Sequence, residues 1–143
     1  MDQSQSAGKI QAAAPAAAAQ DFSTGKVTFI GLAHATHDTY TAFLPALLPV
    51  LIEKFAMAKT EASLLTVFMQ SPSLLQPFIG YLADRKGLRF FVSATPAIAA
   101  ILMSLLGIMP SYILVAILLL VVGINSAVLH ATGPVLAGRL SGQ

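Results

Sequence analysis

The sequence contains no cysteine and no tryptophan, and it carries little charge. The absence of cysteine excludes disulfide bonds and cysteine-ligated metal sites. Of its 143 residues, 10% are charged and 56% are apolar, whereas about a quarter of the residues in a soluble domain are charged. Too few charges are present to cover a soluble globule of this length. Together with a mean hydropathy of +0.77, this composition indicates that most of the chain lies in lipid.

The motifs of catalysis and of nucleic-acid recognition are also missing. The basic residues form no long run and no continuous face, which argues against nucleic acid as a partner. The sequence has no phosphate-binding glycine loop, no H-E-x-x-H pattern and no nucleophile elbow. We therefore predict that the chain is not an enzyme, and we predict neither a metal site nor a cofactor.

Long apolar stretches dominate the chain after a distinct first segment. Residues 1–25 are rich in Ala, Gln and Ser and predict a disordered cytoplasmic tail. Residues 26–143 are nearly continuous apolar sequence, broken in three places. Each stretch reaches the roughly 20 residues that a helix needs to cross about 30 Å of hydrocarbon. We expect an all-α membrane protein whose four transmembrane helices cover about 27–52, 62–83, 90–109 and 112–138.

The positions of lysine and arginine predict the orientation of these helices. If four helices alternate in direction, six basic residues fall on one side: Lys9, Lys26, Arg85, Lys86, Arg89 and Arg139. The other side has Lys54 and Lys59, which are offset by Glu53 and Glu61. We therefore expect a multi-pass protein of the cell inner (plasma) membrane, with both ends of this chain in the cytoplasm.

The first predicted helix carries the most informative polar side chains. His34 and Asp38 are one turn apart on one face, and Asp38 lies about halfway along the span. A carboxylate at that depth costs roughly 2.5–3.5 kcal/mol on insertion scales, and histidine suits proton exchange near neutral pH. One hypothesis is that Asp38 takes up a proton or contacts substrate, with His34 as its partner and His37 as a further candidate. The alternative is that Asp38 is a hydrogen-bond anchor between helices.

Polar residues on the second and fourth predicted helices extend this set. Gln70 and Gln76 lie on or beside a face of polar and small residues, which can line a water-filled path or pack against the first helix. On the fourth helix, Asn125 and His130 are the candidates. For His130, a hydrogen bond between helices and a role in binding a ligand are equally good explanations. We predict a substrate cavity or proton path among these residues.

Prolines and small residues recur inside the predicted helices. Each proline removes a backbone hydrogen bond and tends to bend the helix. The resulting kinks either serve packing or shape a central cavity, at these positions: Pro45, Pro49, Pro72, Pro77, Pro96 and Pro134. Small residues allow helices to approach closely, and the candidates are Gly80, Gly107, Gly123, Ser126 and Gly133.

A short charged turn joins the second and third predicted helices. No charged residue occurs at 62–83, and four then follow within 84–89. Gly80, Asp84, Arg85 and Gly87 have the types and spacing of the G-x-L-a-D-r-x-G turn, and in this the chain resembles the major facilitator superfamily. The resemblance implies a gating turn on the cytoplasmic side. Asp84 would be the acid of an ion-pair gate, and Arg85 and Arg89 would be its basic partners.

Two longer runs are similar to the fosmidomycin-resistance-like branch of that superfamily. They are H-x-x-x-D-x-Y-x-x-F-L-P-x-L-L-P in the first predicted helix and L-L-Q-P-x-x-G-Y in the second. This similarity implies a cavity-facing role for Asp38. It also implies proton-coupled efflux of a drug or metabolite by an antiporter, including antibiotic resistance.

Transporters of the superfamily have about twelve helices in two halves, whereas four are predicted here. We therefore interpret the chain as an N-terminal fragment of a truncated transporter domain, whose partners are the bilayer, protons, a small-molecule substrate and the remaining helices. Two alternatives stay open. One is a self-contained four-helix membrane protein that acts as an oligomer or interaction partner, and the other is a non-functional remnant.

Overall fold

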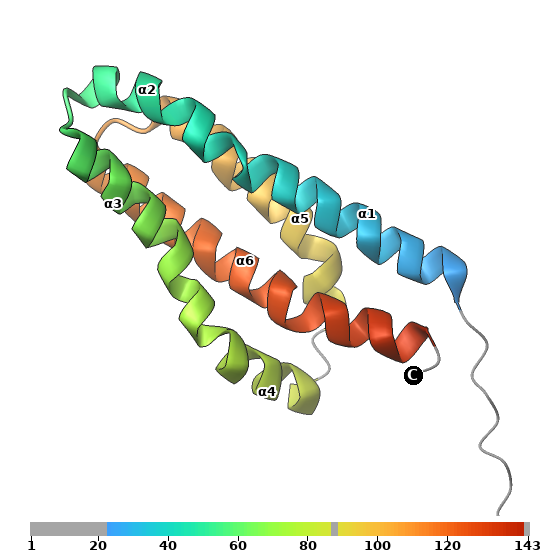
Figure 1. Ribbon diagram of the computed structural model, residues 1–143. Coiled ribbons are helices and arrows are strands. Elements are labelled where there is room, and N and C mark those ends of the chain that lie inside the picture. The colour runs from blue at the N-terminus through green and yellow to red at the C-terminus, as the bar shows by residue number, and fades with distance from the viewer. Residues whose placement is uncertain (1–22, 87–88, 142–143) are drawn as a thin grey trace, which may run out of the picture.

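The computed structural model describes residues 23–86 and 89–141, which form four helical rods in an elongated bundle (Figure 1). Within these residues no strand occurs, so the predicted all-α fold with four helices is confirmed. The predicted tail lies almost entirely outside the described residues. The rods cover residues 24–55, 59–86, 89–108 and 112–140, where the sequence predicts spans of about 27–52, 62–83, 90–109 and 112–138.

Proline explains the interruption of the first rod. This rod consists of α1 (Thr24–Thr41) and α2 (Phe43–Phe55), separated by Ala42 alone. The ring of Pro45 would clash with the carbonyl group four residues earlier, which belongs to Thr41. The helix is therefore interrupted at Ala42, directly after Thr41. The rod ends at Ala56, which adopts a left-handed conformation with φ of 50°.

The second rod is also interrupted, at a pair of prolines. It comprises α3 (Lys59–Gln70), the 3₁₀ segment η1 (Ser71–Leu75) and α4 (Gln76–Lys86). Pro72 occupies the start of η1, and Pro77 lies in the first turn of α4, where a missing N–H is tolerated. The tighter winding of a 3₁₀ segment rotates the face of α4 relative to that of α3.

The third and fourth rods form a hairpin. The third is α5 (Arg89–Leu105) continued by η2 (Leu106–Ile108), and the fourth is α6 (Tyr112–Leu140), whose first turn is capped by the Ser111 hydroxyl. With 29 residues, and a mean hydropathy of 2.6 over an 18-residue window, α6 is the one described helix that is long and apolar enough by itself to cross a membrane. The helices of the first two rods are shorter because of their interruptions.

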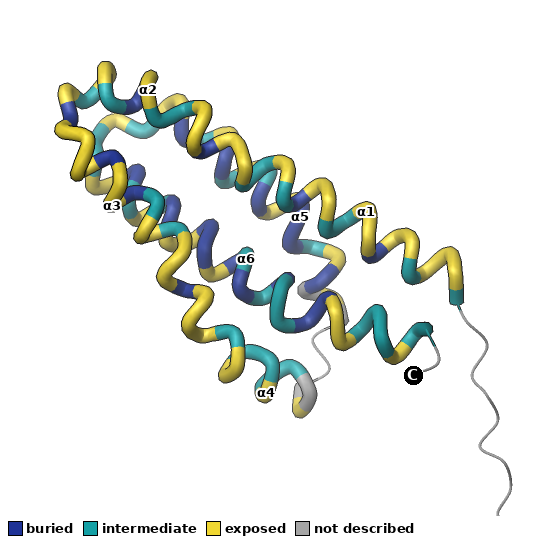
Figure 2. The backbone as a smooth tube through the Cα atoms, viewed as in Figure 1, coloured by how far each residue is buried: buried dark blue, intermediate teal, exposed yellow. Residues whose placement is uncertain are grey.

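The core of the bundle lies along α6, which contacts α1, α3, η1, α4 and α5. Its fully buried residues include Val115, Leu119 and Leu129. Large apolar side chains also cover the outside: Phe90 is 78% exposed and Leu74 is 83% exposed. Figure 2 shows exposed residues along the outer sides of the rods. An outer surface of this kind is suited to lipid rather than to water.

Two rods approach each other closely at Gly123 of α6. A Cβ atom at this position would lie 2.9 Å from Pro72 Cγ and 3.0 Å from the carbonyl carbon of Met69. Only glycine fits, because the second rod presents its backbone here. The prediction of close packing at Gly123 is confirmed. Around Gly80 and Gly107, by contrast, a Cβ atom would meet no described atom within 4 Å.

The connections between the rods lie at the two ends of the bundle (Figure 1). At one end α1 begins and α6 ends, and the backbone N–H of Ser23 donates to the carbonyl of Leu140 over 3.0 Å. At the other end, Lys54 Nζ donates to the carbonyls of Gly107 and Met109, both over 2.9 Å. This lysine therefore fixes the end of α2 to the α5–α6 connection.

Candidate functional site

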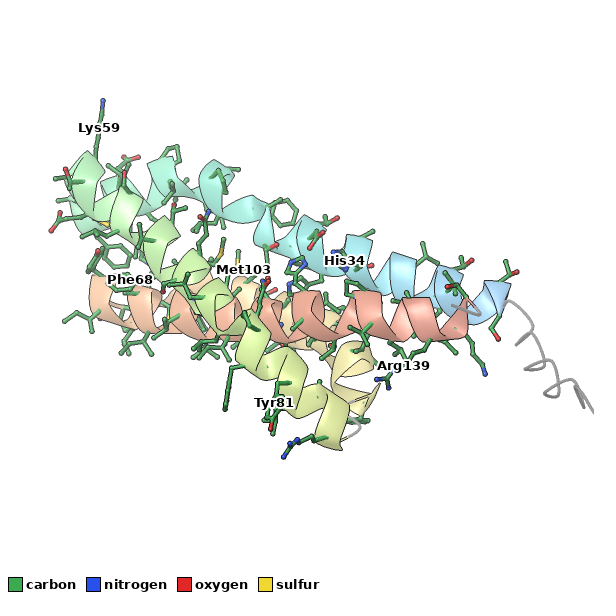
Figure 3. The ribbon with its side chains drawn as sticks, turned by 60° about the horizontal axis from the view of Figure 1, so that its bottom comes forward. His34, Lys59, Phe68, Tyr81, Met103 and Arg139 are labelled. Atoms are coloured by element: carbon green, nitrogen blue, oxygen red, sulfur yellow. The ribbon has the colours of Figure 1, made fainter. Side chains whose placement is uncertain are left out.

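Three polar side chains from two rods meet near the middle of the bundle. On α1, His34 Nε2 lies 3.2 Å from Asp38 Oδ2, as the one-turn spacing predicts. His130 of α6 adds a second imidazole, and its Nε2 lies 3.7 Å from Asp38 Oδ1. The His34 and His130 rings meet edge to face with centroids 4.8 Å apart. Figure 3 shows His34 between the ends marked by Lys59 and Arg139.

A small residue on α6 leaves room for this cluster of His34, Asp38 and His130. A Cβ atom added to Gly133 would lie 3.9 Å from Nδ1 of His34. Because Gly133 and His130 are three positions apart, they lie on one face of α6. The glycine therefore lets α1 approach α6 at the level of the histidine that completes the cluster.

The cluster is partly open, and a third histidine lies behind it. Side-chain exposure is 32% for His34, 48% for Asp38 and 36% for His130, so the described residues do not enclose these groups. His37 is fully buried, and neither of its ring nitrogens has a hydrogen-bond partner among the described residues. Its ring centroid lies 6.0 Å from that of His130. His37 is therefore placed next to the cluster without a hydrogen bond from its ring to Asp38.

A cavity of about 320 Å³ adjoins the cluster through His130. Its volume is within the range of small-molecule sites. It lies between the first, second and fourth rods and is lined by Thr41, Met69, Gln70, Ser73, Gln76, Gly123, Ser126, Ala127 and His130. The structure thus brings together three predicted cavity residues, Gln70, Gln76 and His130. The sequence analysis did not single out Met69 or Ala127, because an apolar lining residue resembles a packing residue in sequence.

Asn125 is a predicted cavity residue that lies apart from both the cavity and the cluster. Its side chain is buried, and Nδ2 donates to the carbonyl of Thr95 on α5 over 2.9 Å. This bond ties α6 to α5, on the side of α6 away from the second rod. The geometry therefore gives Asn125 a packing contact and does not place it in the cavity.

Residues 30–143 match the family model described as the Major Facilitator Superfamily. The chain belongs to this superfamily. It is also similar to an uncharacterized MFS-type transporter, YfnC, of Bacillus subtilis (strain 168), with 26% identity over 117 residues. The match covers 79% of this chain, and it spans about 28% of the relative's length. No solved structure gives a significant match.

Membership in the major facilitator superfamily makes the chain a membrane protein of a transporter family, and its four rods are transmembrane helices. The polar cluster therefore lies within the membrane-spanning part, at a depth where an ionised carboxylate is costly. The two imidazoles offset this cost because either can carry the positive charge that pairs with Asp38.

The chemistry of the cluster follows from its donor set. One atom from each of His34, Asp38 and His130 lies within 4.8 Å of the other two. Such a group of two imidazoles and a carboxylate can share protons, and the same spacing is short enough for the three atoms to reach one metal ion. No other described residues form a comparable group of three.

The gating turn predicted for this superfamily lies partly outside the described residues. Gly87 is not described, and nor are the side chains of Asp84 and Arg89. The guanidinium of Arg85 lies over the ring of Tyr81, 4.5 Å from its centroid. This contact orients Arg85 at the end of α4, and the assignment of the turn as a gate stays a prediction.

Proposed function

We propose that this chain forms part of a secondary active transporter that exports a small solute in exchange for protons. The observation that carries the proposal is the convergence of His34, Asp38 and His130 beside a cavity lined by Gln70 and Gln76. A titratable cluster and a polar cavity share one residue, His130. Proton binding at the cluster can therefore alter the wall of the cavity.

In this mechanism Asp38 is the group that gains and loses the transported proton, and His34 and His130 relay it. When Asp38 is ionised, it attracts a protonated imidazole at 3.2 or 3.7 Å. When Asp38 is protonated, that attraction is lost and α1 is held less tightly to α6. The buried His37 is a further proton station, because its two ring nitrogens have no described partner.

The cavity suggests how the solute is held. Gln70 and Gln76 supply amide donors and acceptors, and Ser73, Ser126 and Thr41 supply hydroxyls. His130 is the lining residue that can carry a positive charge. We propose a polar drug or metabolite as the substrate, in line with the resemblance to the fosmidomycin-resistance-like branch. The remaining helices of a longer protein would complete the site, since transporters of this family bind substrate between two halves.

The charges at the ends of the bundle support an orientation. Lys26, Arg85 and Arg139 lie toward the end where α1 begins and α6 ends, and Lys54 and Lys59 lie toward the other. Because Glu53 and Glu61 offset Lys54 and Lys59 at that other end, the first end carries the basic excess. We propose that this end faces the cytoplasm, in the inner membrane.

The test begins with the intact mass of the protein in its own membranes, which gives the native length. Inverted vesicles that contain this native-length protein are then given a pH gradient, and solute-dependent proton movement is followed with a pH-sensitive dye. We expect proton movement in the wild type and in Glu53→Gln, whose carboxylate is exposed at a helix end. We expect it to be roughly ten- to a hundredfold slower in Asp38→Asn. Unchanged proton movement in Asp38→Asn would exclude the proposed coupling.

A further inference from the structure

A second cavity, of about 380 Å³, lies between α1, α5 and α6 at the end of the bundle where α1 begins. We call it the end groove. It is lined by Gly25, Lys26, Phe29, Ile30, Ala33, Val92, Ser93, Leu136 and Leu140. None of these residues lines the cavity beside His130 or belongs to the polar cluster. The end groove is therefore a separate feature, and an argument about it does not depend on the proposed transport.

The lining of the end groove has two chemical parts. Phe29, Ile30 and Leu136 give it an apolar wall. Lys26, in the first turn of α1, adds a positive charge at the end of the helix, and Lys26 is exposed and forms no ion pair with a described residue. Among the residues that the structure describes, no carboxylate lines the end groove. The lysine and the apolar wall together therefore suit a ligand that has both an anionic group and an apolar portion.

The position of the end groove specifies the source of such an anion. Since the rods cross the bilayer, the first turn of α1 and the last turn of α6 lie at the depth of the lipid headgroups. The bond from Ser23 N–H to the Leu140 carbonyl holds these two helix ends together, and both helices line the end groove.

We propose that the end groove binds an anionic phospholipid of the surrounding bilayer. One acyl chain lies against Phe29, Ile30 and Leu136, and the phosphate lies at Lys26, with the hydroxyl of Ser93 as a further donor. Basic pockets between transmembrane helices are suited to such headgroups, and one lysine near the membrane surface strengthens anionic-lipid binding about fivefold. The bound lipid would fill the gap between three rods and so hold α1 to α5 and α6.

The experiment is native mass spectrometry of the protein at its native length, in detergent micelles that contain equal amounts of phosphatidylglycerol and phosphatidylcholine. We expect about fivefold more retained phosphatidylglycerol than phosphatidylcholine in the wild type. In Lys26→Gln this preference disappears. In Lys59→Gln, which removes an exposed lysine at the other end of the bundle, the preference stays.

A second variant tests the apolar part of the end groove. Ala33→Leu narrows the groove at a half-buried lining position, and we expect less retention of both lipids while the helical circular dichroism is unchanged. Equal retention of the two lipids by the wild type would overturn the proposal, as would loss of the preference in Lys59→Gln. Displacement of the lipid by inorganic phosphate would also overturn it, because the site would then bind an anion without its acyl chain.

Discussion

Asp38 of α1 and His130 of α6 lie 3.7 Å apart, and they join the first and last rods of the bundle within the membrane. The contact is supported on α1 by His34, at 3.2 Å from the same carboxylate. Two positions distant in sequence thus form one acid–base group. The first prediction concerns the acid.

Replacing Asp38 by Asn removes the charge and the proton-accepting oxygen while keeping the shape of the side chain. Hydrogen bonds to charged groups are worth about 1.5–3 kcal/mol, so we expect transport driven by a pH gradient to fall by roughly ten- to a hundredfold. The measurement is initial rate in vesicles, with His34→Gln as a companion variant that should show a smaller loss. If Asp38→Asn reduced the transport rate by the same factor in the absence of a pH gradient, Asp38 would have no role in coupling.

Replacing Gly123 by Ala introduces a methyl group where α6 meets the backbone of Met69 and the ring of Pro72. The helices must move apart, and overpacking of this kind costs about 1–3 kcal/mol. We expect a lower melting temperature in detergent. Gly138→Ala is the matched control on the same helix, since a Cβ atom there meets no described atom within 4 Å. If both variants melt alike, the close approach at Gly123 does not stabilise the bundle.

Replacing Asn125 by Leu removes the bond to the Thr95 carbonyl and keeps an apolar side chain of similar size. We expect the protein to lose about 1 kcal/mol of stability, with substrate affinity unchanged, because the residue faces α5. The comparison is Gln70→Leu, which changes the lining of the cavity and should weaken substrate binding at nearly constant stability. If Asn125→Leu instead weakened substrate binding at nearly constant stability, Asn125 would be a lining residue of the cavity.

Replacing Asp84 by Asn tests the gating turn, whose acid the resemblance to the superfamily assigns. We expect a slower turnover with substrate binding unchanged, because an ion-pair gate controls the exchange between states. Stopped-flow transport and equilibrium binding separate the two quantities. Asp84→Glu keeps the charge and should restore much of the rate. Weaker binding at an unchanged turnover rate would count against the gate.

The fold could be predicted from the sequence to a large extent because lipid restricts the choices. Apolar length and scarce charge predict helices, and helical spacing alone predicts the pairing of His34 with Asp38. The interruption after Thr41 follows from Pro45 once the steric rule is applied to the residue four positions earlier. These are local relationships along one helix, so they are present in the sequence.

The meeting of the cluster with the cavity could not be predicted in this way. His130 reaches Asp38 because Gly123 and Gly133 set how closely α6 approaches its neighbours, and this distance is a tertiary property. Asn125 is polar and lies in the same helix as His130, yet it points to α5. The sequence predicts both residues as members of the cavity, and only the packing of α6 distinguishes their positions.

The central place of α6 has a consequence for biosynthesis. The helix that supplies Val115, Leu119 and Leu129 to the core is the last of the four rods to leave the ribosome. Until it enters the membrane, the first and second rods touch each other mainly near the α2–α3 connection, and the carboxylate of Asp38 has only His34 beside it. The first rod can pack on the third through α1 and α5 before then, so the second rod is the one that waits for α6, and translation of α6 is the event that closes the bundle.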